Sequence, residues 1–264
     1  MIRLAWGYCL LLLGMLLYVA TCFAWAVVSW ILWPLLPARW GRKVGRRGAM
    51  LGFRWFFWAM EGLGAWRLDV HALDALEDAG PLIVAPNHPG LLDALLLVSR
   101  MPDAVCVMKG SLLGSFLLAP AARLARYVPN DSLMKLMTRA HGELRGGAQL
   151  LLFPEGTRTA GGAIGPLTEA VGAISRRTQV PVQAVIIEAS EPFLCKRWSL
   201  LALPRFPIHF RVRLGKRFDP PDDVRAFTEE LDRHYRRELA AATMQTAVEA
   251  LGAPAVEDVP HVRG

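Results

Sequence analysis

A histidine and an aspartate in the string HPGLLD, His88 and Asp93, are the residues whose types and spacing suggest catalysis. The run Leu82–Ala85 before them is apolar, as in a strand, and the run Leu91–Ser99 after them is apolar, as in a helix. The imidazole is therefore expected on a loop at a strand end, held by a scaffold and open to substrate. A turn would bring the carboxylate to the ring, where it fixes the tautomer and stabilises the imidazolium.

No serine or cysteine nucleophile lies beside this pair. The imidazole is therefore predicted to act as a general base on a hydroxyl group that the substrate supplies. The alternative for the same spacing is a histidine that caps a helix next to a solvated aspartate.

A second polar group, FPEGTRT from Phe153 to Thr159, also follows an apolar run, Gln149–Leu152. Its glycine, Gly156, allows close approach of a ligand to the backbone. The guanidinium of Arg158 suits a phosphate or carboxylate, which it binds through two parallel hydrogen bonds. The segment therefore predicts an anion site at a second strand end, and a surface turn with a salt bridge is the alternative.

The two motifs, in this order, resemble the lysophospholipid acyltransferase family, whose familiar bacterial members are 1-acyl-glycerol-3-phosphate acyltransferases. Asn87, His88 and Asp93 match the family's NHxxxxD motif, and the EGTR string matches a second family motif. The segment Val180–Val185 resembles a further family block, with Ala184 where a proline is usual. The resemblance covers about Leu82 to Glu188.

This resemblance implies that His88 is the catalytic base and Asp93 its partner. It also implies a substrate-binding set that holds the acceptor's phosphate, comprising Asn87, Lys109, Glu155, Gly156, Thr157 and Arg158. The implied reaction moves a fatty acyl group from acyl-CoA or acyl carrier protein to a lysophospholipid hydroxyl, with 1-acyl-glycerol-3-phosphate giving phosphatidic acid. No cofactor and no metal are expected.

One departure from the family pattern concerns the acceptor. The second family block usually ends in an arginine, but here Tyr127, Val128 and Pro129 are followed by Asn130 and Asp131. The site thereby loses a cation and gains a carboxylate. Two alternatives stay open: acylation of another lipid, such as an amino-acid lipid or a specialised fatty-acid or polyene product, and a non-catalytic membrane lipid-binding protein.

The N-terminal part is predicted to associate with the membrane. The chain is 53% hydrophobic and carries no charged residue from Leu4 to Pro37, whereas about 20 apolar residues suffice to cross a bilayer. A cleaved signal peptide has a shorter apolar region, of about 7–15 residues. We expect either a single span or, with Pro34 and Pro37 near the end of the run, a hairpin that enters and leaves one leaflet.

Five cations follow this run: Arg39, Arg42, Lys43, Arg46 and Arg47. By the positive-inside rule they predict an inner-membrane protein whose catalytic domain faces the cytoplasm. They are expected to attract anionic lipid headgroups. Because they supply most of the net charge of +7, nucleic acid is a poor explanation of the high pI.

The rest of the chain alternates apolar strand and helix patterns, which predicts an α/β fold: a mixed β-sheet covered by helices on both faces. The expected division is a membrane-anchoring helical segment (1–67), an acyltransferase domain (68–251) and a disordered tail (252–264). Phe206–Leu214 reads as an edge or late strand, and Ser111–Arg126 as a helix broken at Pro120. The aromatic-rich stretch Leu51–Trp66 suits a membrane-interface helix, a core helix or both.

Overall fold

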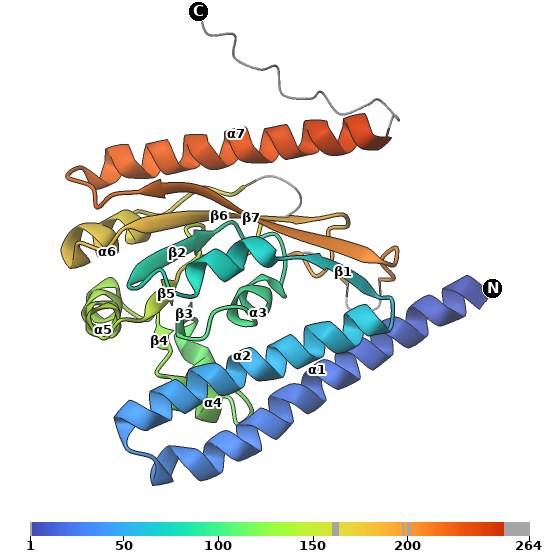
Figure 1. The fold of residues 1–264 in the computed structure, drawn as a ribbon, viewed down its shortest axis with the longest axis horizontal. Coiled ribbons are helices and arrows are strands. Elements are labelled where there is room, and N and C mark those ends of the chain that lie inside the picture. The colour runs from blue at the N-terminus through green and yellow to red at the C-terminus, as the bar shows by residue number, and fades with distance from the viewer. Residues whose placement is uncertain (1, 160–163, 197, 200–201, 251–264) are drawn as a thin grey trace, which may run out of the picture.

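A seven-stranded sheet forms the centre of the computed structural model, which describes residues 2–159, 164–196, 198–199 and 202–250, with side chains from 4 to 242. The strand order is β1-β7-β6-β2-β5-β3-β4. Every neighbouring pair is parallel except β6 with β7, so the sheet is mixed, as predicted (Figure 1). The strands are β1 (Trp66–Asp69), β2 (Leu82–Pro86), β3 (Ala104–Met108), β4 (Val128–Pro129), β5 (Gln149–Leu151), β6 (Val182–Ala189) and β7 (Ile208–Phe218).

Helices cover both faces of this sheet, which confirms the predicted fold class. One face packs on α2 (Ala38–Gly62), α3 (Asp93–Val98) and the 3-10 helix η1 (His71–Leu76). The other packs on α5 (Leu133–Arg145), α6 (Ala170–Thr178) and α7 (Val224–Ala250).

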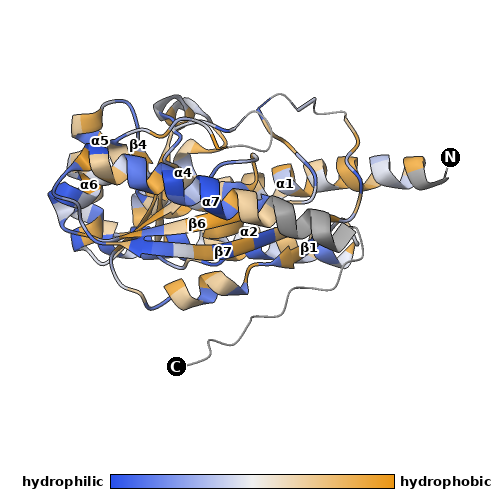
Figure 2. Cartoon of the chain, turned by 90° about the horizontal axis from the view of Figure 1, so that it is seen from above, coloured by the Kyte–Doolittle hydropathy of each residue, from blue (hydrophilic) through white to orange (hydrophobic). Residues whose placement is uncertain are grey.

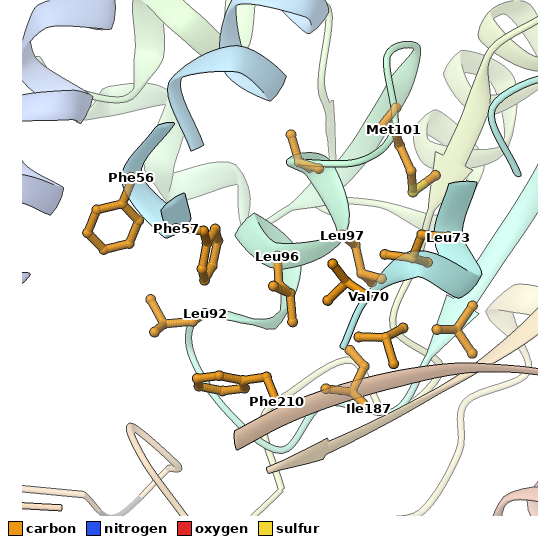
Figure 3. Close-up of a cluster of buried hydrophobic side chains, with 14 of the residues drawn as sticks. Phe56, Phe57, Val70, Leu73, Leu92, Leu96, Leu97, Met101, Ile187 and Phe210 are labelled. Atoms are coloured by element: carbon orange, nitrogen blue, oxygen red, sulfur yellow. The ribbon is translucent and has the colours of Figure 1, made fainter. Parts of the chain in front are cut away.

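Alternation along β2 explains the two cores. Leu82 and Val84 belong to the first core, whereas Ile83 and Ala85 belong to the second, as the period of two along a strand requires. Figure 3 shows the first core, in which Phe56 and Phe57 of α2 lie near Leu96 of α3.

The N-terminal segment is a helical hairpin of α1 (Ile2–Leu35) and α2, which run side by side (Figure 1). Helix α1 contacts the rest of the protein along its length: Gly7 faces Leu203, Gly14 faces Met60 and Trp33 lies under the guanidinium of Arg123. Its opposite face carries large exposed apolar side chains, among them Leu4, Leu12, Leu16, Phe23 and Ile31. In Figure 2 the α1 ribbon has the colour of hydrophobic residues along much of its visible length.

One of the five N-terminal cations departs from its expected role. The side chain of Arg46 is only 2% exposed and pairs with Asp103 at 2.6 Å and Glu143 at 2.5 Å, and its Nε donates to the carbonyl of Ala125 at 3.0 Å. A buried cation with these partners ties α2 to α4 and α5. The expectation that all five cations attract lipid headgroups is therefore wrong for Arg46.

The aromatic residues of α2 lie on both a core face and an outward face of the helix. Phe56 and Phe57 are buried, whereas Trp55 and Trp58 are exposed, so the helix presents one face to the core and one outward.

Other local predictions need correction. Pro120 does not break a helix; it lies in the first turn of α4 (Ala119–Ala125), where its missing N–H costs nothing. Before it lies a short 3-10 helix, η2 (Gly110–Gly114). The expected edge or late strand is a late strand, since β7 is the last strand along the chain, and it does not lie at an edge because β1 and β6 flank it. The edge strand β4 was not foreseen. The expected division into domains stays a prediction, with its boundary after residue 67 lying in β1. The expected tail, 252–264, lies outside the described residues.

Candidate active site

The loop after β2 carries the histidine, and the imidazole and carboxylate meet as predicted. His88 Nδ1 lies 2.9 Å from Asp93 Oδ2. The same oxygen accepts a hydrogen bond from the backbone N–H of Gly90 at 2.7 Å. The Asp93 side chain is 3% exposed and that of His88 is 16% exposed. The Nδ1 contact leaves Nε2 as the nitrogen that can take a proton from a substrate hydroxyl.

Burial raises the pKa of Asp93 above the usual range for an aspartate, and the hydrogen bonds from His88 and Gly90 act against this rise. These donors favour the charged form of the carboxylate, and burial opposes it. A carboxylate so placed is suited to stabilising an imidazolium that forms during a reaction.

Glu155 joins the two motifs. Its Oε1 accepts from the backbone N–H of His88 at 2.8 Å, and its Oε2 accepts from Thr159 Oγ1 at 2.5 Å and from Gly165 N at 2.8 Å. The backbone N–H of Thr159 donates to the carbonyl of His88 at 2.9 Å. The EGTR segment therefore lies directly against the His88 loop, and the buried Glu155 carboxylate fixes both.

Asn87 does not point into a substrate pocket. Its Nδ2 donates to the Ile187 carbonyl at 2.9 Å, and its Oδ1 accepts from the Ile187 N–H at 2.7 Å. Both ends of the buried amide are thus used by the main chain of β6. Asn87 therefore does not make the implied contact with substrate. Its amide instead holds the start of the His88 loop against β6.

Arg158 is partly buried, and its Nη1 donates to the carbonyl of Leu194 at 3.1 Å. The same carbonyl accepts from the N–H of Leu91, just after the catalytic loop, at 3.1 Å. Leu194 therefore orients both the arginine and the histidine loop. Thr157 is exposed, and Gly156 has a φ of 65°, a conformation that favours glycine.

Phe153 is a site residue that the sequence analysis did not single out. Its ring stacks on the His88 imidazole, with centroids 3.9 Å apart and an interplanar angle of 24°. This stacking fixes the plane of the imidazole and shields one of its faces from water. The signal was its position two residues after β5 and two residues before Glu155 of the EGTR motif.

Strand register places Lys109 at the same edge of the sheet as His88. Cys106 of β3 and Val84 of β2 are both aligned with Leu151 of β5, so the residues after these strands emerge together. Lys109 is exposed. Beside it, Asp131 packs so closely on Gly110 that a Cβ added there would lie 1.4 Å from the carboxylate.

A cavity of about 250 Å³ opens next to the loop that carries His88. It lies between α1, α2, the start of α3 and the segment around Leu194, and it has almost no polar lining. A site of this kind takes a hydrocarbon chain. Its lining includes Leu11, Gly14, Met15, Phe56, Met60, Leu91, Leu92, Phe193 and Leu194.

Comparisons with known proteins find similar acyltransferases. Residues 67–188 match the family model named Acyltransferase. The 1-acyl-sn-glycerol-3-phosphate acyltransferase alpha of Ovis aries is 24% identical over 172 residues, which cover 62% of this chain and 60% of that protein. The 1-acyl-sn-glycerol-3-phosphate acyltransferase of Pseudomonas aeruginosa is 25% identical over 207 residues, covering 76% and 77%.

A solved structure shares the fold. The crystal structure of the 1-acyl-sn-glycerophosphate (LPA) acyltransferase PlsC from Thermotoga maritima matches with a TM-score of 0.68 at 17% identity, and the match covers 92% of this chain and 98% of that chain. The match extends over nearly the whole chain, so the N-terminal hairpin is part of the shared architecture.

Proposed function

We propose that this chain transfers a fatty acyl group to the hydroxyl of a lysophospholipid, with 1-acyl-glycerol-3-phosphate as acceptor and phosphatidic acid as product, because residues 67–188 match the acyltransferase family model and carry both motifs of that family. The donor is a thioester, acyl-CoA or acyl carrier protein. The observation that carries this proposal is the position of the His88–Asp93 pair between an arginine-bearing loop and an apolar cavity.

The proposed reaction uses His88 as general base. Its Nε2 takes the proton from the acceptor hydroxyl while the oxygen attacks the thioester carbonyl carbon. The C–S bond then breaks, and the imidazolium returns the proton to the leaving thiolate, which gives an ester and a free thiol. Asp93 stabilises the imidazolium between these two transfers.

The acceptor's anionic head is proposed to lie against Arg158 and Lys109. A guanidinium binds a phosphate through charge-assisted hydrogen bonds, and the exposed lysine adds a second positive charge at the same sheet edge. Thr157 and Gly156 line this region, and Glu155 acts by holding the loop in place.

The hairpin is proposed to lie within one leaflet of the membrane. Helix α1 touches the rest of the protein from Gly7 to Trp33, about 39 Å at 1.5 Å per residue. A helix that crossed the bilayer would carry these contacts into the lipid. The exposed apolar surface of α1 extends to Phe116, whose ring packs against that of Trp30. An inner membrane and a cytoplasmic active site remain part of the proposal.

A second candidate reaction keeps the chemistry but changes the acceptor. The Asp131 carboxylate packs on Gly110, next to Lys109, where the family pattern has an arginine nearby. A negative charge there weakens binding of a phosphomonoester and favours an acceptor whose head is less negative, such as an amino-acid lipid or a specialised fatty-acid or polyene product. The intact His88–Asp93 pair argues against a purely lipid-binding role.

Thiol release from a thioester donor, measured with a panel of lysolipid acceptors, tests these proposals. We expect release with 1-acyl-glycerol-3-phosphate, and we expect His88→Ala to lower the turnover number about 10²- to 10⁴-fold with an unchanged circular dichroism spectrum. Release with another acceptor alone would support the second candidate. No release with any acceptor, or near-normal rates in His88→Ala, would refute the assignment.

A further inference from the structure

A second cleft, of about 600 Å³, lies away from the catalytic loop. It is bounded by the end of α1, the start of α2, α4, β4 and α5. Four arginines line it, and one carboxylate does: Arg42, Arg123, Arg126 and Arg139 against Glu143. Neither sequence motif contributes to it.

The charge of this cleft is positive after the internal pairs are counted. Glu143 is already paired with Arg46 at 2.5 Å and with Arg126 at 3.3 Å. It therefore does not neutralise Arg123 or Arg139, both of which are exposed. Arginines gathered around one hollow are suited to a phosphate group, which accepts their paired N–H donors.

The cleft also borders an apolar surface. The Arg123 guanidinium lies 5.4 Å from the Trp33 ring, which is itself part of the lining. One turn earlier on α1, Trp30 packs against Phe116 with ring centroids 5.9 Å apart, and the side chains of Trp30, Trp33 and Phe116 are all exposed. Tryptophan at such a border between apolar and cationic surface is typical of the membrane interface.

The cleft is separate from the proposed acyl-transfer site. Arg126 comes just before β4, and Glu143 is bridged through Arg46 to Asp103, just before β3. These residues lie at the amino ends of parallel strands, whereas His88 follows the carboxyl end of β2. A ligand in the cleft is therefore not the acceptor undergoing reaction.

We propose that this cleft binds the phosphate headgroup of an anionic membrane phospholipid, whose acyl chains lie along the exposed face of α1. The joint presence of four guanidinium groups and adjoining exposed aromatic rings favours this occupant over a soluble anion, which would use the charges alone. The inference rests on the proposed membrane placement of α1 but not on the acyl-transfer chemistry. Its role is to fix the orientation of the domain on the membrane.

The test measures, by calorimetry, how tightly the full chain in neutral detergent binds short-chain phosphatidylglycerol. This lipid is neither acceptor nor product of the proposed reaction. Phosphatidylcholine of the same chain length is expected to bind at least tenfold more weakly. A basic side chain near an anionic lipid surface contributes about fivefold to binding, so Arg123→Gln with Arg139→Gln should raise the Kd for phosphatidylglycerol about 25-fold.

Arg176→Gln with Arg177→Gln is the matched control, because both arginines are exposed on α6 and the same charge is removed. This control is expected to change the Kd less than twofold. Equal losses in the two double variants, or equal binding of both lipids to the wild type, would overturn the proposal. Inorganic phosphate binding as tightly as phosphatidylglycerol would replace the lipid with a soluble anion.

Two further measurements separate the remaining explanations. If the cleft variant loses binding of an acidic carrier protein but keeps phosphatidylglycerol, the cleft is a protein-docking site and the lipid proposal is wrong. Flotation of the wild type with neutral phosphatidylcholine vesicles tests the membrane placement by itself. If the protein does not float with the vesicles, the proposed placement of α1 is wrong, and the lipid assignment of the cleft is overturned with it. The proposed acyl transfer would still stand, because a soluble short-chain acceptor tests it without a membrane.

Discussion

Replacing Asp93 with asparagine tests the central arrangement. Asparagine has nearly the same shape, and its amide oxygen can accept the hydrogen bonds from Gly90 N and His88 Nδ1 that now reach Asp93 Oδ2 at 2.7 and 2.9 Å. The geometry is therefore kept while the negative charge is lost. The variant isolates the charge of the carboxylate.

The expected loss follows from the distance and burial of the pair. Opposite charges about 4 Å apart attract by about 4 kcal/mol at an effective dielectric constant of about 20, and Asp93 is 3% exposed. If the imidazolium that forms in the transition state loses this attraction, the activation free energy of acyl transfer rises by the same amount. Since about 1.4 kcal/mol corresponds to a factor of ten, kcat should fall about 10³-fold, with KM for both substrates little changed.

Initial rates of thiol release, with the acceptor and the thioester varied in turn, give kcat and KM separately. Asp131→Asn serves as the control, because it removes an exposed carboxylate at the same sheet edge without touching the imidazole. A kcat for Asp93→Asn within tenfold of the wild type would refute the proposed stabilisation of the imidazolium.

The stability of the same variant has an expected sign. Burial raises the pKa of Asp93 in the folded protein above that in the unfolded chain. The folded state then binds the proton more tightly, so this group lowers stability as pH rises through its folded pKa. Asp93→Asn should therefore become more stable relative to the wild type with rising pH, as urea titrations at several pH values measure. The opposite trend would mean that hydrogen bonding outweighs burial.

Three other substitutions test separate parts of the molecule. Arg158→Ala is expected to raise KM for a phosphate-bearing acceptor about 10- to 100-fold, because hydrogen bonds to charged groups contribute about 1.5–3 kcal/mol; an unchanged KM in initial-rate measurements would exclude Arg158 from the anion site. Arg46→Met removes a partner of the buried Glu143 and should lower the free energy of unfolding by about 3–5 kcal/mol; a loss under about 1 kcal/mol in urea titration would contradict the structural role. Gly14→Leu should shift the donor preference to shorter acyl chains, because the added side chain takes up space in the cavity, where a Cβ at Gly14 would lie 2.8 Å from Met60 Cε. An unchanged preference for acyl-chain length in competition assays would mean that the acyl chain lies elsewhere.

The sequence predicted the parts of the site that depend on local pattern. The apolar run before His88 and the one before Glu155 form neighbouring parallel strands, and parallel strands present their carboxyl ends at one edge. The pairing of His88 with Asp93 needs only a turn of a few residues. The alternation of strands and helices was likewise sufficient to predict a sheet covered on both faces.

Other parts could not be predicted because they depend on contacts between distant segments. Nothing in the local sequence around Asn87 says that its amide would be taken up by Ile187, or that the Leu194 carbonyl would orient Arg158. The cation pattern around Arg46 is that of a membrane-proximal helix, yet this one side chain is buried. Its partners come from α4, from α5 and from Asp103 just before β3, which only the tertiary structure brings together.

The sequence by itself determined the residues of the proposed chemistry: an imidazole and a carboxylate on one loop, an arginine on another, and an apolar N-terminal run, all of which are properties of residue type and short-range spacing. The tertiary structure alone decided where the apolar cavity and the arginine-lined cleft lie. Both are formed by packing the N-terminal hairpin against segments that are distant in the chain, and such packing depends on shape and burial across the whole fold, which no local pattern encodes.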